Sequence, residues 1–183
     1  MKILQVAPYF TPYVGGQERY VHNLSKHLVK LGNLVDVATS NYPKSDVFDS
    51  MDGFSVRRFP CLFRPLRNPI APALLELEEI ADDYDVIHAH NEHAFSALIA
   101  SYISAKHNIP LVLTCHGRLV FGNAFYDALE RMYSASIARS IFRKADAVCA
   151  LSDHDREYIL SFGSIDPSKI LEVCTGIDPE LLS

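Results

Sequence analysis

The chain has 183 residues, of which 49% are apolar, and a formal net charge of −5. This length suits one domain with its own core, which needs no disulfides or metal to hold it together. The acidic balance argues against a nucleic-acid-binding protein, because such proteins usually carry a basic excess. No apolar run approaches the ~18 residues that a membrane-spanning helix requires.

The N-terminus and the cysteines indicate a cytoplasmic protein. The apolar run that begins at Ile3 is short and ends at Pro8, which is unlike a signal peptide. The four cysteines stand at positions 61, 115, 149 and 174, without a C-x-x-C spacing. Cysteines so far apart are typical of reduced, buried thiols in the cytoplasm. We therefore expect a soluble cytoplasmic protein whose contact with a membrane is at most peripheral.

In the first half of the chain, apolar runs alternate with amphipathic stretches. Strands are expected over 3–7, 34–39 and 54–59, and a helix over 17–31. Gly32 is placed to end that helix in a left-handed conformation, and Asp52-Gly53 is a turn before the third strand. A proline-rich loop over 60–72 and a short acidic helix over 73–81 follow.

The second half continues this alternation and defines the fold class. Strands are expected over 85–89, 111–115, 147–151 and 170–174, and helices over 94–106, 126–143 and 153–162. Ser152-Asp153 is typical of an N-cap, and Gly163 ends the last helix. The alternation predicts βαβ units with right-handed crossovers. The expected fold is α/β, a Rossmann-like parallel sheet with helices on both faces (three layers, α/β/α), forming a single domain over 1–183.

Ligands of such sheets bind beyond the carboxyl ends of the strands, where the loop over 8–16 carries Gly15-Gly16. Two glycines before a helix let backbone N–H groups approach an anion, and the helix dipole favours negative charge there. The pair is neither the G-x-G-x-x-G fingerprint nor a P-loop, and a plain tight turn is the alternative. Glu18 either interacts with the positive helix end or binds a substrate hydroxyl. We expect this turn to be formed and open.

Histidines gather in the loop that follows a later strand. His88, His90 and His93 with Glu92 suggest a zinc site. However, His88 and His90 share one strand face and no second ligand pair stands nearby, so no metal is expected. Substrate contacts are the preferred interpretation, with packing or supporting hydrogen bonds as the alternative.

His116 ends the next strand and is placed to project into the same crevice. It could donate a hydrogen bond to a substrate oxygen or anion, and a purely structural role is the alternative. A Cys-His nucleophile is not expected, because Cys115 and His116 are adjacent and point to opposite faces.

A further segment mixes cations with apolar residues, namely Arg57, Arg58, Arg64 and Arg67 with Phe59, Leu62, Phe63 and Leu66. It suits peripheral contact with an anionic membrane or a charged acceptor. A solvated loop held by a few apolar contacts is slightly favoured.

Several segments, taken together, carry a resemblance: 1–6 (MKILQV), 12–18 (PYVGGQE), 21–24 (VHNL), 28–32 (LVKLG), 85–90 (DVIHAH), 113–117 (LTCHG), 145–148 (ADAV) with Ser152, and 175–178 (TGID). In order and spacing they resemble the N-terminal domain of a family 4 (group 1) glycosyltransferase with the GT-B fold. The resemblance implies a retaining enzyme that moves a sugar from a nucleotide-sugar donor to a glycan, glycolipid or small-molecule acceptor. It implies no metal or other cofactor.

The resemblance also implies site residues. The histidine that matches His116 lies near the transferred sugar and is expected to be catalytic, and the loop that matches Gly15 and Gly16 approaches the donor diphosphate. Acceptor or substrate contacts are expected from Glu18, His90, His93, Arg118 and Thr175.

The sequence departs from the family at its end. The family's C-terminal domain carries the nucleotide site and a glutamate pair spaced E-x7-E, whereas this chain ends at Ser183, just after 175–178. Thr175 also stands where the family usually has asparagine. We therefore expect the nucleotide-sugar-binding domain to be absent from this chain, which alone should bind donor poorly and be inactive.

Two other classes of function are possible. A stand-alone half of the fold could be a non-catalytic module that binds a sugar, a glycolipid headgroup or a partner. A dinucleotide-dependent oxidoreductase is disfavoured, because the second strand ends Ala38-Thr39-Ser40 without the acidic residue that would contact the ribose.

Overall fold

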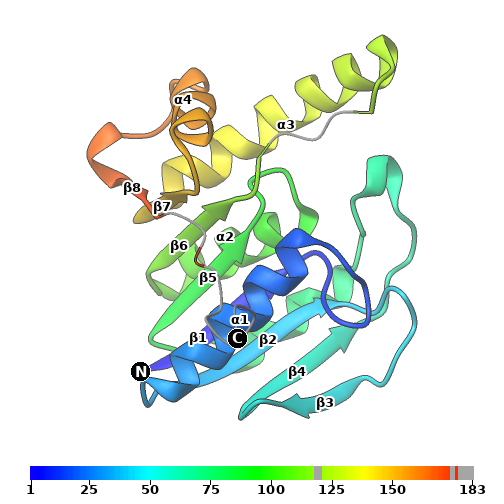
Figure 1. The fold of residues 1–183 in the computed structure, drawn as a ribbon, viewed down its shortest axis with the longest axis vertical. Coiled ribbons are helices and arrows are strands. Elements are labelled where there is room, and N and C mark those ends of the chain that lie inside the picture. Colours follow the sequence, from blue (N-terminus) through cyan, green and yellow to red (C-terminus); the bar gives the residue numbers. More distant parts are fainter. Residues whose placement is uncertain (118–120, 174–175, 177–183) are drawn as a thin grey trace.

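A computed structural model of the chain describes residues 1–117, 121–173 and 176. Its strands are β1 (Lys2–Ala7), β2 (Leu34–Ser40), β3 (Phe48–Met51), β4 (Phe54–Phe59), β5 (Val86–His90), β6 (Leu111–Cys115), β7 (Ala147–Ala150) and β8 (Ile170–Glu172). They form one sheet in the order β3-β4-β2-β1-β5-β6-β7-β8 (Figure 1). Every neighbouring pair is parallel except β3 and β4, which are antiparallel.

The helices are α1 (Gly16–Lys30), α2 (Phe95–His107), α3 (Ala124–Lys144) and α4 (Asp153–Ser161), with 3₁₀ helices over Pro65–Arg67, Pro72–Asp83 and Pro167–Lys169. Side chains of β1 show that helices cover both faces of the sheet. Ile3 and Ala7 belong to the apolar cluster that contains Val21 of α1. Leu4 and Val6 point the other way, into the cluster formed with α2 and the 3₁₀ helix Pro72–Asp83. The Rossmann-like α/β prediction is confirmed.

Burial on both faces explains the sequence pattern of the strands. A strand covered on both sides presents apolar side chains in both directions, so it reads as a continuous apolar run. Residues 3–7 of β1 and 113–115 of β6 are all buried. The expected helix ends are confirmed as well: Gly32 and Gly163 have φ of 84° and 60°, and the Ser152 side chain accepts a hydrogen bond from the backbone N–H of Asp155.

The structure differs from the prediction at the sheet edge. Strand β3 was not expected, and it makes the sheet mixed rather than purely parallel. It joins β4 through Asp52 and Gly53, whose φ values of 49° and 86° both lie in the left-handed region favoured by two-residue hairpin turns. The expected acidic helix over 73–81 is a longer 3₁₀ helix, Pro72–Asp83. Residue 174, expected at the end of the last strand, lies outside the described residues.

The structure also corrects the prediction made for the arginine-rich segment over 57–67. Arg58 is buried, and its guanidinium donates hydrogen bonds to the carbonyl oxygens of Thr11 (2.8 Å) and Asp46 (2.9 Å). Arg57 pairs with Glu76 at 2.6 Å. These two arginines therefore stabilise the fold rather than offer surface cations, whereas Arg64 and Arg67 are exposed. Among the described residues, no helix combines the length and apolar character needed to cross a membrane.

Asn68 fixes the path of the proline-rich loop. Its side-chain amide donates to the carbonyl oxygen of His93 (3.0 Å) and to the hydroxyl of Tyr133 (3.2 Å). Its carbonyl oxygen accepts from the backbone N–H of Phe95 (3.0 Å), at the start of α2. Because Ala94, the N-cap of α2, has no side-chain cap, Asn68 supplies the cap from a distance. One buried side chain thus joins the loop to α2 and α3.

Replacing Asn68 with alanine should lower the free energy of unfolding by about 1–3 kcal/mol, because buried hydrogen-bonding groups lose their partner. Urea unfolding followed by circular dichroism measures the change. Asn23→Ala is the control, since Asn23 is partly exposed on α1 and its side-chain oxygen lies 3.5 Å from Nδ1 of the adjacent His22. Equal stability of the two variants would contradict this role of Asn68.

Candidate functional site

The candidate site lies where the strand order reverses. β2 and β4 lie on one side of β1, and β5 to β8 lie on the other. The loops after β1 and β5 therefore run apart, which is where ligands bind in such sheets. A cleft of about 400 Å³ lies there. Its lining includes Tyr9, Tyr13, Gly15, Gly16, Gln17, Glu18, Arg67, Asn68, Asn91 and His93.

The cleft brings together only part of the predicted site. Gly15, Gly16, Glu18 and His93 line it, whereas the described lining does not include His90 or His116. Arg118 and Thr175 lie outside the described residues.

Several residues of the cleft are absent from the predicted site residues, although the sequence places Arg67 in a segment suited to a charged acceptor. Tyr9 and Tyr13 stack with ring centroids 4.4 Å apart. Arg67 enters from the proline-rich loop. Asn91 follows β5 with a φ of 66°, a left-handed conformation that asparagine tolerates better than most residues. An asparagine directly after a strand end was the signal available in the sequence.

The glycine turn holds a carboxylate of the chain itself. A Cβ on Gly15 would lie 2.3 Å from Oε2 of Glu18, whereas a Cβ on Gly16 would meet nothing within 4 Å. Glu18 is thus folded back over the first turn of α1, where backbone N–H groups and the helix dipole favour an anion. The expectation of an open turn is wrong on the Gly15 side, because this side chain fills the space there.

The environment of Glu18 disfavours its charge. Burial raises the pKa of Glu18, and a hydrogen bond from its own backbone N–H only partly opposes that effect. The carboxylate therefore takes up a proton at a higher pH than an exposed glutamate would. A second anion at the same helix end would compete with it directly.

A hydrogen-bonded chain of three side chains runs from Gln5 inside β1, through His90 at the end of β5, to His116 just after β6. Nε2 of His90 lies 2.7 Å from the side-chain oxygen of Gln5, and its Nδ1 lies 3.2 Å from Nε2 of His116. With Gln5 presenting its carbonyl oxygen, His90 donates through Nε2 and accepts from His116 through Nδ1. In this tautomer, Nδ1 of His116 is left as an acceptor.

The histidines behind the cleft are neutral. Burial lowers the pKa of His116 to about 4 despite the nearby Glu92 and Asp155 carboxylates. Burial, with the neighbouring rings of His88 and His116, lowers the pKa of His90 well below its usual value. His88 and His90 stack with centroids 4.4 Å apart, as expected for residues on one strand face. These rings can exchange hydrogen bonds at neutral pH without carrying charge.

His93 has the opposite character. Its Nδ1 lies 3.4 Å from Oε1 of Glu92, which is fully buried. Burial lowers the pKa of His93, but the hydrogen bond and charge of Glu92, with the charge of Glu130, outweigh it and raise the pKa overall. Burial likewise raises the pKa of Glu92, and His93 outweighs it and lowers the pKa overall. In the wall of the cleft, His93 and Glu92 thus each favour the charged form of the other.

Cys115 is not an activated thiol. It is buried, and burial together with the Glu92 carboxylate raises the pKa of its thiol well above the usual value. A nucleophilic thiolate requires the opposite shift. Within the part of the chain that the structure describes, no three His, Cys, Asp or Glu side chains are placed to hold a metal ion together.

Comparison with known proteins identifies the family. The sequence model of Glycosyltransferase Family 4 matches residues 14–181, which is most of the chain. The chain belongs to glycosyltransferase family 4. The family indicated by the sequence motifs is thereby confirmed.

This family 4 chain spans about half the length of the curated relatives that it matches. GDP-mannose:cellobiosyl-diphosphopolyprenol alpha-mannosyltransferase of Xanthomonas oryzae pv. oryzae is 26% identical over 186 residues, covering 97% of this chain and 47% of the relative. D-inositol 3-phosphate glycosyltransferase of Kineococcus radiotolerans is 24% identical over 180 residues, covering 90% of this chain and 41% of the relative.

Solved structures share the fold over the same half. Sucrose-phosphate synthase from Thermosynechococcus elongatus superposes with a TM-score of 0.69 at 16% identity, covering 98% of this chain and 49% of that protein. HepE of Anabaena, solved in complex with UDP, gives a TM-score of 0.68 at 20% identity, covering 99% of this chain and 46% of that protein. The family 4 chain therefore has the Rossmann-like architecture of one half of a GT-B enzyme.

Adding a methyl group at Gly15 should displace the Glu18 carboxylate, because the two would overlap. In Gly15→Ala, the pKa of Glu18 should fall towards that of an exposed glutamate, as the burial that raises it is relieved. Titration of the Glu18 side-chain carboxyl carbon by NMR measures this shift. Gly16→Ala is the matched control and should leave the titration unchanged. An unchanged titration in Gly15→Ala would show that Glu18 does not occupy the turn.

Neutral buried histidines should make the fold sensitive to acid. The pKa of His90 is lowered in the folded chain, so the unfolded chain binds more protons below about pH 6.5. Stability should therefore fall as the pH drops below about 6.5, by up to about 1.4 kcal/mol per pH unit for each such group. Unfolding free energies measured between pH 7 and 5 should show a shallower fall in His90→Gln, whereas the exposed control His154→Gln should follow the wild type. Parallel curves for all three proteins would count against the prediction.

Proposed function

We propose that this chain is the N-terminal, acceptor-side domain of a retaining glycosyltransferase. The enzyme moves a sugar from a nucleotide-diphosphate sugar to a sugar or lipid-linked acceptor. The observation that carries the proposal is a polar cleft at the strand-order reversal of a family 4 chain, with the glycine turn in its wall. The donor nucleotide is held mainly by a second domain, and the isolated chain is inactive.

The proposed site residues divide between donor and acceptor. Backbone N–H groups at Gly15 and Gly16 face the donor diphosphate and stabilise the leaving group, an electrostatic task suited to a helix N-terminus. His116 lies near the transferred sugar and, through Nδ1, accepts a hydrogen bond from one of its hydroxyls. Glu18 and His93, together with Arg118 and Thr175, contact the acceptor, while His90 acts by orienting His116. No metal or other cofactor takes part.

The enzyme works in the cytoplasm, with peripheral contact to a membrane. Support for a reducing compartment comes from Cys61, Cys115 and Cys149, which are all free thiols. Support for a lipid-linked acceptor comes from the relative that acts on cellobiosyl-diphosphopolyprenol.

The test joins this chain to a C-terminal nucleotide-sugar-binding domain and measures sugar transfer from GDP-mannose and from UDP-sugars. Gly16→Val and His116→Ala should each lower turnover by roughly 10²-fold, the usual effect of removing one preorganised transition-state contact. His154→Ala, on the exposed side of α4, is the control. Turnover that survives both site substitutions would refute the site assignment.

A non-catalytic sugar-binding module is the second candidate. It is favoured by the lining of the cleft, which joins the stacked rings of Tyr9 and Tyr13 to polar side chains such as Asn91 and Gln17. Calorimetric titration of the isolated chain with mono- and oligosaccharides distinguishes the two. Saturable sugar binding by the isolated chain, with no transfer after the second domain is joined, would favour the module.

A further inference from the structure

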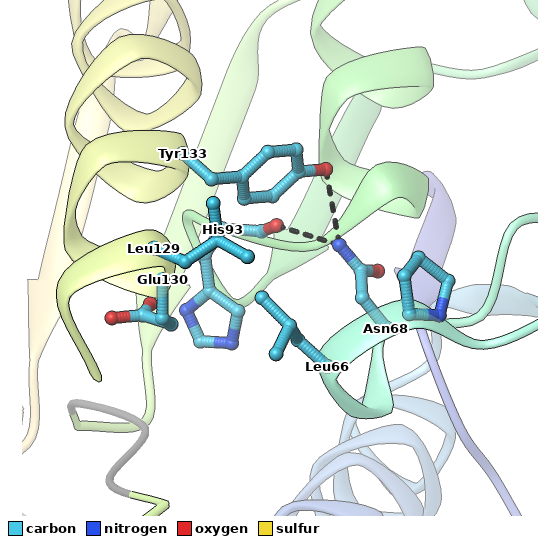
Figure 2. A pocket seen from close by; sticks show the side chains of 7 residues that line it. Leu66, Asn68, His93, Leu129, Glu130 and Tyr133 are labelled. Atoms are coloured by element: carbon cyan, nitrogen blue, oxygen red, sulfur yellow. Dashed lines mark hydrogen bonds between the residues drawn. The ribbon is translucent and has the colours of Figure 1, made fainter. Parts of the chain in front are cut away.

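A second cavity of about 240 Å³ adjoins the polar cleft (Figure 2). Its lining comes from the proline-rich loop (Pro65, Leu66, Asn68), from α3 (Leu129, Glu130, Tyr133) and from His93. Asn68 and His93 line both cavities, so the two spaces share a wall at these residues.

Apolar groups dominate this second cavity. Leu66 and Leu129 point toward each other across it, and Tyr133 presents its ring while its hydroxyl accepts the hydrogen bond from Asn68 (Figure 2). The carboxylate of Glu130 points away from Leu66. The space therefore suits hydrocarbon, whereas the adjoining cleft suits polar groups.

The apolar lining continues onto the exposed surface. Phe125, Leu129 and Met132 follow one another at steps of four and three residues, so they form one stripe along α3. Their exposed fractions are 71%, 39% and 66%, although such a stripe is usually buried against a core. Leu62 and Phe63, 68% and 60% exposed, stand on the loop opposite. In Figure 1 this loop and the start of α3 project from the same side of the sheet.

Two consecutive residues connect the cavities. Leu66 and Arg67 have φ values of 48° and 59°, a left-handed conformation that is uncommon for side chains of this kind and marks functional segments. Leu66 enters the apolar cavity and Arg67 enters the polar cleft. Among the residues that the structure describes, no carboxylate is recorded in an ion pair with Arg67 or with the exposed Arg64 beside it. An acidic group at this junction would meet two cations.

We propose that the apolar cavity binds the hydrocarbon chain of a lipid-linked acceptor, with the phosphate of that lipid held near Arg64 and Arg67. The proposal rests on the acceptor-side function and specifies its substrate as an amphiphile. The polar head occupies the cleft beside the glycine turn. A chain longer than the cavity continues between the exposed apolar side chains into the bilayer, where burial of each further CH₂ is favourable.

The experiment titrates the 183-residue chain with farnesyl phosphate below its micellar concentration and follows binding by calorimetry. Farnesol, which lacks the phosphate, and inorganic phosphate, which lacks the hydrocarbon chain, are titrated separately. Farnesyl phosphate should bind saturably and at least about 10-fold more tightly than either, because chain and phosphate contribute together. Leu129→Glu should weaken its binding by at least about 10-fold, because a carboxylate would enter the apolar cavity.

Leu31→Glu is the matched control, since Leu31 is 78% exposed at the far end of α1, and its affinity should stay within about 2-fold of wild type. Met132→Glu, at the more exposed part of the stripe, replaces Leu129→Glu if circular dichroism shows that the latter does not fold. Phosphate alone binding as tightly as farnesyl phosphate, farnesol binding as tightly, or an unchanged affinity in the stripe variant would each overturn the proposal. The proposal would also be overturned if farnesyl phosphate did not bind at all. That result is expected if a protein domain covers the stripe.

This experiment is independent of catalysis, so the two proposals can fail separately. Sugar transfer to a water-soluble acceptor by the joined enzyme would persist if only the lipid-chain proposal were wrong. Farnesyl phosphate binding without any transfer would refute the catalytic proposal alone.

Discussion

The reversal of strand order between β1 and β5 is the constraint on which the rest of this chain depends. β1 pairs in parallel with β2 on one side and with β5 on the other, so its carboxyl end is fixed from both directions. The loops that leave β1 and β5 must run apart, and the space between them stays open. The polar cleft lies at these two strand ends. The apolar cavity stands beside it, because Asn68 ties the proline-rich loop to His93 and to the start of α2.

Whether the sequence predicts an element depends on how that element is stabilised. Strands such as β1 and β6 are buried on both faces, so their apolar runs identify them without knowledge of their neighbours. β3 cannot be predicted from an apolar run, because three of its four residues are exposed at the sheet edge. Only Asp52-Gly53 indicates its hairpin. Gly15 and His93 can be placed in the cleft because they belong to the loops that follow β1 and β5. Arg67 and Asn68 cannot, because long-range hydrogen bonds to Tyr9, His93 and Phe95 set the path of their loop.

The residue type alone does not determine whether a histidine is charged, because the neighbouring side chains set its pKa. His90 and His93 are three residues apart and both buried, yet their pKa values move in opposite directions. His90 is surrounded by other imidazoles and an amide, so burial keeps it neutral. His93 faces Glu92 and Glu130, which outweigh burial and favour its cation. Environments that separate the pKa values of like side chains allow neighbouring groups to take different roles. His90 is thus neutral and lies within hydrogen-bond distance of His116, whereas the pKa of His93, in the wall shared by the two cavities, is raised.

Glu18 bears on how the proposed donor site would be used. Its carboxylate lies at the end of α1, where the diphosphate of a donor would bind, and burial already raises its pKa. Two anions at one helix end repel each other, so donor binding requires Glu18 to turn away or to take up a proton. Either change would subtract from donor affinity at the proposed site. The φ of −164° at position 15 suits any residue, so what a Cβ there would change is the place of the Glu18 carboxylate, which would have to shift.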